Sequence, residues 1–189
     1  MSRPLSARGP RPILSGNMSI LIGDELKKAL DNGLVKVEPL DPSQIGPGSV
    51  DLTLGNDFRI FKKQVGLYEV RDDSRFEDVT ELVTVPDGGY MMIGPGEMIL
   101  GITKEKVTLA PSIAGLLEGR SRFARFGLAV HVTAGFMQPG ISNREVLEIV
   151  NLGQTPLAIF PGTKICQMVF VRCEGEATYQ GRFKAQETP

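Results

Sequence analysis

Short apolar runs separated by turns are the feature that most limits what this chain can fold into. Several runs alternate apolar and polar residues, as in residues 49–54, and glycine or proline stands between many of them. The 189 residues include 22 glycines and 13 prolines. An average domain contains only roughly 12 % of these two types together. The pattern favours many short β-strands over a helical bundle.

The apolar runs place the expected strands along one domain. In residues 49–54, Val50, Leu52 and Leu54 can face a core. Further strands are expected at residues 58–61, 91–93, 98–102, 113–117, 128–132, 146–150, 157–160 and 165–171. The polar stretch from 62 to 89 is expected to hold strands with a long insertion. This spacing predicts a mainly β domain, built as a β-sandwich, jelly roll or distorted barrel.

A short amphipathic helix is expected after Gly23. Leu26, Ala29 and Leu30 share one face of this helix. Gly33 can end it in the left-handed conformation.

The composition excludes several kinds of site and partner. A lone histidine, His131, cannot supply a multi-histidine metal centre, and Cys166 and Cys173 miss the Cys-x-x-Cys spacing of zinc sites. The 21 basic residues are balanced by 22 acidic ones, which argues against nucleic-acid binding. No apolar run approaches the roughly 18 residues of a membrane span.

The first 17 residues contain Arg3, Arg8 and Arg11 but lack the continuous apolar core of a secretory signal. We expect a disordered arm over residues 1–17, and Met18 is an alternative start. A cytoplasmic protein with reduced thiols is therefore expected.

Residues 118–127, Glu-Gly-Arg-Ser-Arg-Phe-Ala-Arg-Phe-Gly, are the most informative stretch. Ser121 stands as a helix N-cap, and about one helical turn fits before the last glycine. Ser121 and Arg125 can project the same way, and Arg120 or Arg122 can converge on the helix start. Free N–H groups, a hydroxyl and a guanidinium favour an anion such as phosphate. A capped surface turn with solvated arginines explains the pattern equally well.

A histidine and two small residues follow. Alternation places His131 on the face opposite the apolar residues of the strand expected at 128–132. A single histidine on a strand is more often a hydrogen-bonded structural residue than a catalyst, and we interpret His131 in this way. Ala134 and Gly135 come at the strand end, where a ligand can approach the backbone closely.

Two glutamates lie in the strand region that comes next. Alternation places Glu148 between Val146 and Val150 on one face, while Glu145 can reach solvent where the strand begins. A carboxylate on an apolar face is expensive to ionise, so we expect a raised pKa for Glu148 unless a cation lies nearby. A raised carboxyl pKa suits a general acid/base near neutral pH. An edge-strand glutamate that points at water is the alternative.

Together these motifs resemble the dCTP deaminase family, within the trimeric dUTPase-like superfamily. The resemblance runs from Ile20 to the end of the chain. It is strongest at Glu118-Gly-Arg-Ser, Arg125-Phe-Gly-Leu, His131-Val-Thr-Ala and Val146-Leu-Glu-Ile-Val-Asn, with supporting matches at 49–56, 95–97 and 161–167. It implies a dUTPase-like distorted β-barrel over residues 18–178 with one or two short helices. It also implies a homotrimer with active sites at the subunit interfaces.

The reaction that this resemblance implies is the hydrolytic deamination of dCTP to dUTP and ammonia, without zinc. Glu148 would be the general acid/base. Ser121 and the backbone carbonyl of Ala134 would position the nucleophilic water, and Arg125 would orient and support Glu148.

The resemblance also implies how the nucleotide is bound. The implied substrate-binding residues are Arg120, Arg122, Thr133, Gln138, Gln167, Tyr179, Arg182 and Gln186. Mg²⁺ would bind mainly through the triphosphate oxygens, with no metal ligand from the protein. Residues 179–189 would form a mobile C-terminal lid, in which Arg182 replaces a usual lysine and Phe183 a usual tyrosine.

Two departures from the family pattern bear on the product. Arg122 stands where a second serine is usual, so the phosphate contacts must differ. Gln138 stands where dUTPases have the aspartate that activates water for phosphate cleavage. A neutral amide cannot act as a base, so we expect a deaminase that does not efficiently release pyrophosphate from dUTP.

Two alternatives to this prediction stay open. The first is a bifunctional deaminase–diphosphatase or a dUTPase, which Gln138 disfavours. The second is a catalytically silent nucleotide-binding regulatory trimer, and the presence of Ser121, Arg125 and Glu148 together argues against it.

Overall fold

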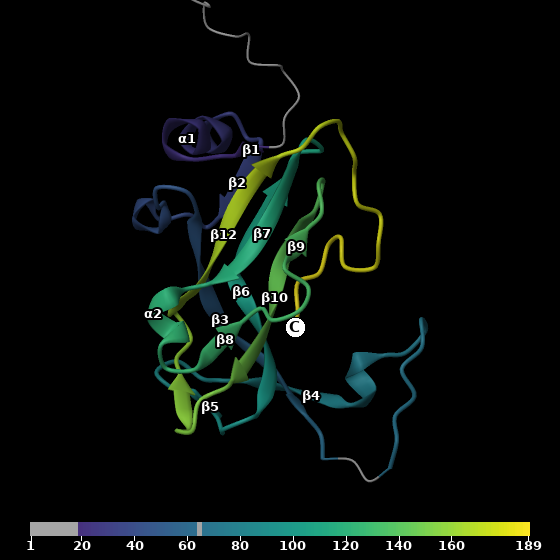
Figure 1. The fold of residues 1–189 in the computed structure, drawn as a ribbon. Coiled ribbons are helices and arrows are strands. Elements are labelled where there is room, and N and C mark those ends of the chain that lie inside the picture. The colour runs from purple at the N-terminus through teal and green to yellow at the C-terminus, as the bar shows by residue number, and fades with distance from the viewer. Residues whose placement is uncertain (1–18, 64–65) are drawn as a thin grey trace, which may run out of the picture.

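An antiparallel ten-stranded sheet carries the fold of residues 19–63 and 66–189, which are the residues that the computed structural model describes (Figure 1). Its main strand order is β8 (Leu128–Val130), β10 (Ser142–Asn151), β6 (Met98–Leu109), β3 (Val50–Phe61), β12 (Lys164–Arg172), β7 (Ile113–Gly119) and β9 (Phe136–Met137). The arm expected at 1–17 and the alternative start at Met18 lie outside the described residues.

Shorter elements extend this sheet or pack beside it. Strand β1 (Ser19–Ile20) pairs with β12, β2 (Val35–Glu38) with β6, and β4 (Thr80–Thr84) with β3. Strands β5 (Met91–Ile93) and β11 (Leu157–Ile159) form a separate two-stranded sheet. The helical elements are α1 (Gly23–Asp31), α2 (Ser121–Ala124) and the 3₁₀ turns η1 (Pro42–Gln44) and η2 (Phe76–Asp78).

The expected helix and most expected strands are confirmed, with one fusion. Leu26 and Ala29 are the buried face of α1, and Gly33 follows the helix with φ +71°. The strands expected at 49–54 and 58–61 are one strand, β3. Its register against β6 shifts between Leu54 and Phe58, so a bulge occupies the interval between the two expected strands.

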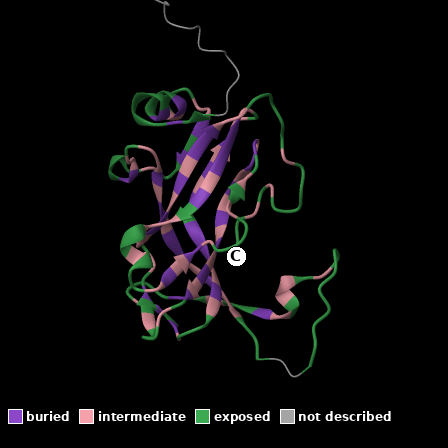
Figure 2. Ribbon diagram, in the orientation of Figure 1, coloured by how far each residue is buried: buried purple, intermediate pink, exposed green. Residues whose placement is uncertain are grey.

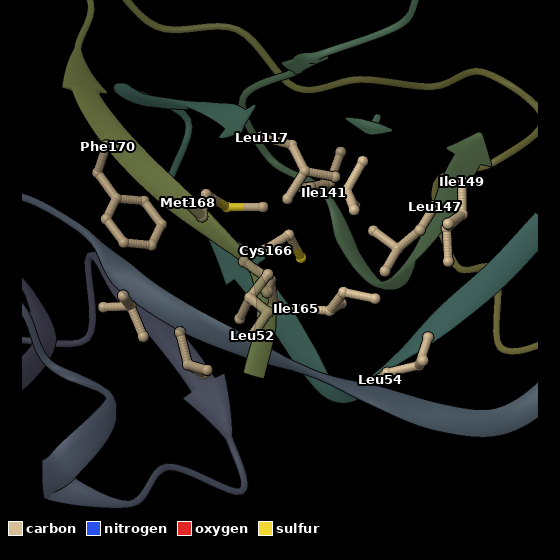
Figure 3. Packing of buried hydrophobic residues seen from close by; sticks show 14 of the residues in the cluster. Leu52, Leu54, Leu117, Ile141, Leu147, Ile149, Ile165, Cys166, Met168 and Phe170 are labelled. Atoms are coloured by element: carbon tan, nitrogen blue, oxygen red, sulfur yellow. The ribbon is translucent and has the colours of Figure 1, made fainter. Parts of the chain in front are cut away.

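The core lies inside the curl of the large sheet, where buried and partly buried residues alternate along the main strands (Figure 2). Leu52 and Leu54 from β3, Leu147 and Ile149 from β10, and Met168 from β12 are fully buried in one cluster (Figure 3). The predicted fold class, a mainly β domain with one or two short helices, is confirmed. No helix within the described ranges is long and apolar enough to cross a membrane.

The C-terminal segment, residues 179–189, runs beside the start of β10 (Figure 1). The backbone N–H of Ser142 donates to the carbonyl of Lys184 at 3.2 Å, and the N–H of Arg144 donates to the carbonyl of Gln186 at 3.0 Å. The ammonium of Lys106 pairs with Glu187 at 2.7 Å. Residues 179–189, which are expected to form the lid, therefore contact the start of β10.

The turn after α2 depends on a glycine, and a substitution there tests the packing. Gly127 has φ +81°, and a Cβ at this position would lie 2.5 Å from the backbone nitrogen of Gly153. We expect Gly127→Ala to lower the free energy of unfolding by about 2–4 kcal/mol in urea titrations. The control is Gly162→Ala, which has φ +87° but open space around its Cβ and should lose only about 1 kcal/mol. Equal losses in the two variants would contradict this account of the turn.

Candidate functional site

Glu148 lies within β10 and is held by the segment that follows β8. The backbone N–H groups of Val132 and Thr133 donate hydrogen bonds to its Oε2 at 3.1 and 2.6 Å. The Thr133 hydroxyl donates to its Oε1 at 2.6 Å. A carboxylate has about four acceptor positions. These bonds therefore fix its orientation and leave one acceptor position on Oε1.

The turn at His131 brings these donors to Glu148. We expected His131 on a strand, but β8 ends at Val130 and His131 has φ +60°, so that prediction is wrong. This left-handed conformation is uncommon for a residue with a side chain. The backbone N–H of His131 donates to the carbonyl of Glu148 at 2.9 Å, which closes the turn against β10. The next two residues then present their N–H groups to the Glu148 carboxylate.

The pKa of Glu148 is lowered, which corrects the raised value that we expected. Partial burial raises this pKa, but the hydrogen bonds from the side chain and backbone of Thr133 outweigh the burial. The charge of His131 and the Val132 N–H lower it further. Glu148 is therefore ionised near neutral pH and can begin a reaction as a base.

Glu145, which we expected to reach solvent, is instead buried. It is 3 % exposed and lies on the inward face of β10 together with Leu147 and Ile149. Burial raises the pKa of Glu145 to about 8. The prediction failed because both faces of residues 145–150 carry a glutamate among apolar residues, so alternation alone does not say which face points inward.

A cavity of about 480 Å³ lies beside the two glutamates. The residues predicted from the sequence that line it are Ala134, Gln138, Glu148, Tyr179 and Gln186. Thr133 joins them through its hydrogen bonds to Glu148. The prediction missed Asn143 and Glu145, which also line the cavity. Their place on the strand of Glu148 was the only available signal.

The residues of the Arg120–Arg125 segment are not brought to this cavity within the chain. Ser121 is the first residue of α2 rather than its N-cap, which is Arg120, so the capping prediction is wrong. Ser121, Arg122 and Arg125 are exposed. The guanidinium of Arg120 pairs with Asp51 at 2.9 Å and donates to the carbonyl of Lys164 at 2.7 Å. Arg120 therefore has a structural role between strands, whatever else it binds.

Gln167 and Arg182 do not line the cavity themselves and have other partners. The side chain of Gln167 accepts a hydrogen bond from Ser49 at 2.8 Å and donates to the carbonyl of Gly119 at 3.1 Å. The guanidinium of Arg182 lies 3.8 Å from Glu77 and stacks over the ring of Phe76. Arg182 therefore ties the C-terminal segment to the polar insertion.

Metal-binding donors are not grouped in the described part of the chain. Over residues 19–63 and 66–189, no three His, Cys, Asp or Glu side chains lie together in a way that could hold a metal ion.

Known proteins resemble this chain in sequence and in fold. The family described as dCTP deaminase-like matches residues 20–173. A protein of Methanobrevibacter smithii named "dCTP deaminase, dUMP-forming" is 39 % identical over 155 residues, which cover 81 % of this chain and 80 % of that protein. A protein of the same name from Kocuria rhizophila is 36 % identical over 178 residues, 90 % of this chain and 92 % of that protein.

A solved structure shares the fold. The 2′-deoxycytidine 5′-triphosphate deaminase from Agrobacterium tumefaciens matches with a TM-score of 0.64 at 18 % identity. The match covers 82 % of this chain but 48 % of that one, so this chain spans about half the length of the solved protein.

The buried carboxyl of Glu145 predicts a pH dependence of stability. Its pKa is about 8 in the folded chain against an ordinary value of 4.5, so between these values the unfolded chain has released a proton that the folded chain still holds. Stability should therefore fall as pH rises through this window, by up to about 1.4 kcal/mol per pH unit, and level off above pH 8.

Glu145→Gln removes this titration. Urea unfolding is measured at pH 5, 6, 7, 8 and 9, values that span the window expected from linkage. The free energy of unfolding of the variant should rise relative to that of the wild type up to about pH 8. Parallel stability curves for the two proteins would contradict the burial of an ionisable Glu145.

Proposed function

The chain belongs to the dCTP deaminase-like family, and from this premise we propose that it hydrolyses the 4-amino group of dCTP, giving dUTP and ammonia. The observation that supports the proposal most directly is the Glu148 carboxylate. Hydrogen bonds hold it on the cavity wall, and one acceptor position of Oε1 stays available. An ionised, oriented carboxylate of this kind can take a proton from water.

The proposed reaction uses Glu148 to move both protons of the water. Glu148 takes the first proton as the water oxygen adds to C4 of the cytosine ring, and it delivers this proton to ring N3. The second proton passes to the amino nitrogen as the C4–N bond breaks, so ammonia leaves and a C4 carbonyl forms. The carbonyl of Ala134, which lines the same cavity, positions the water in this scheme.

The remaining roles require a second copy of the chain. Ser121 and Arg125 belong to the α2 segment and are exposed, and neither lines the cavity that contains Glu148. We infer a homotrimer in which α2 of one copy completes the cavity of the next. Ser121 then holds the water, and Arg125 orients the Glu148 carboxylate.

The arginines that would bind the phosphates lie outside the cavity lining. Among the described residues that line the cavity there is no lysine or arginine, whereas Arg122 and Arg182 are exposed. These arginines are suited to bind the triphosphate, and Mg²⁺ accompanies the nucleotide through the phosphate oxygens. Tyr179 and Gln186 line the cavity from the C-terminal segment, where a closing lid would contact the nucleotide.

The product is the point on which the relatives and this chain's residues differ. The relatives from Methanobrevibacter smithii and Kocuria rhizophila are named as dUMP-forming, which favours a bifunctional deaminase–diphosphatase as the second candidate. Gln138 lines the cavity of this chain, and an amide cannot accept the proton of a water that attacks phosphorus. We propose dUTP as the main product for this reason.

The activity is tested with dCTP and Mg²⁺, following ammonia, dUTP, dUMP and pyrophosphate. The wild type should release ammonia and dUTP, and Glu148→Gln should lose about a hundredfold or more of kcat because it cannot take the proton. The control Glu81→Gln changes an exposed glutamate of β4 and should keep full activity. Nucleotide binding without turnover in the wild type would contradict an enzyme and favour a silent regulatory protein.

The role of Gln138 is tested in the same assay. Gln138→Asp should increase the dUMP and pyrophosphate formed from dUTP, because it supplies a carboxylate in place of the amide. Abundant dUMP from the wild type would overturn the proposed product and support the bifunctional alternative.

The hydrogen bond from Thr133 predicts a change in the pH–rate profile. Thr133→Val removes the hydroxyl that donates to Glu148 Oε1, so the pKa of Glu148 should rise and the acid limb of kcat should move to higher pH. The control is Thr84→Val, which removes a hydroxyl that donates to Asp57 at 2.7 Å on another strand pair. An acid limb shifted equally in both variants, or in neither, would refute the tuning of Glu148 by Thr133.

A further inference from the structure

Three residues that line the cavity each carry a buried polar atom without a hydrogen-bond partner among the described residues. The atoms are Nε2 of His131, Oδ1 of Asn143 and Oε1 of Glu145. Buried polar atoms are paired in the great majority of cases, and an unpaired one costs free energy. Their gathering at one cavity indicates that this wall is built to contact a polar ligand.

A second buried glutamate shows that burial alone does not leave a carboxyl unpaired in this fold. Glu105 is 2 % exposed and does not line the cavity. Its Oε1 accepts a hydrogen bond from the Gln44 side chain at 2.7 Å, and its Oε2 accepts one from the Thr53 N–H at 2.7 Å. Glu145 is as deeply buried, and its Oε1 has no such partner. Glu145 therefore differs from Glu105 both in lining the cavity and in having an oxygen without a hydrogen bond.

The chemistry of the wall selects an uncharged ligand with both donors and acceptors. The Asn143 amide donates through Nδ2 to the carbonyl of Phe183 at 3.0 Å, which leaves its Oδ1 as an acceptor. Burial keeps Glu145 protonated at neutral pH, so its carboxyl can donate one hydrogen bond and accept others. The rings of Phe76, Phe136 and Tyr179 also line the cavity. The described residues of this lining include aromatic rings and the ionised Glu148 but no lysine or arginine, so they fit a nucleoside better than a phosphate.

We propose that Asn143 and Glu145 form a second polar contact of the site, which hydrogen-bonds the nucleoside part of the substrate and contributes to its specificity. This inference rests on the proposed function, because it takes the cavity beside Glu148 as the nucleotide site. Glu148 then carries out the proton transfers, while the uncharged Asn143–Glu145 pair binds the nucleoside without adding a negative charge to the cavity.

The test compares nucleotide affinity with stability in two variants of Glu145. Glu145→Leu removes the hydrogen-bonding group, so the Kd and KM for dCTP should rise about three- to tenfold, with a smaller effect on kcat. Its unfolding free energy at pH 7 should stay the same or rise, because an unpaired polar group is gone. Glu145→Gln keeps an uncharged donor and acceptor and should bind dCTP within about twofold of the wild type.

Two controls separate this role from a structural one. Glu105→Gln changes the paired buried glutamate and should leave dCTP affinity unchanged while stability falls. Asn143→Leu removes the second unpaired acceptor and should weaken dCTP binding as Glu145→Leu does, which keeps the test open if Glu145→Leu does not fold.

The outcomes also distinguish this inference from the proposed function. An affinity for dCTP equal to that of the wild type in Glu145→Leu, or in Asn143→Leu if only that variant folds, would overturn the inference. The proposed function would stay intact in that case, provided that the wild-type protein deaminates dCTP. If the wild type neither binds nor deaminates dCTP, the proposed function fails and the inference fails with it.

Discussion

The pairing of β10 with β8 on one side and with β6 on the other determines which glutamate of β10 faces the core and which one is ionised. In this register Ile149 faces Val130 across one edge and Ile99 across the other, so the odd-numbered residues of β10 point into the core. A shift by one residue would exchange the two faces. Glu148 would then be buried and Glu145 would face out. The register thus assigns the ionised carboxylate to one glutamate and the buried, protonated carboxyl to the other.

The turn after β8 supplies the hydrogen-bond donors that keep Glu148 ionised, so that it can act as a base. His131 adopts a left-handed conformation, which costs of order 1–3 kcal/mol for a residue with a side chain. The turn gives Glu148 two backbone donors, and Thr133 adds its hydroxyl. A carboxylate held by such donors stays ionised even though it is partly buried. Local backbone strain and the lowered pKa of Glu148 are therefore two consequences of one local structure.

Much of the fold could be predicted from the sequence, because its main signals are local. Alternation located most of the strands, and Leu26, Ala29 and Gly33 marked the first helix. The family resemblance placed Glu148 and Ala134 in one predicted site, and both residues line one cavity. The states of the two glutamates could not be predicted. Both faces of residues 145–150 look alike in the sequence, and the choice between them depends on pairing with β6, about 40 residues earlier in the chain.

The proposed function requires Glu148 of one copy to act together with Ser121 of another, because Ser121 does not line the cavity that contains Glu148 in its own chain. The direct measurement is the deamination activity of trimers formed by co-expressing Glu148→Gln and Ser121→Ala, each inactive on its own. If the two residues come from different copies, about a quarter of the sites in a random mixture contain both intact residues, and activity should return to that level. Mixed trimers that stay inactive would contradict the shared site.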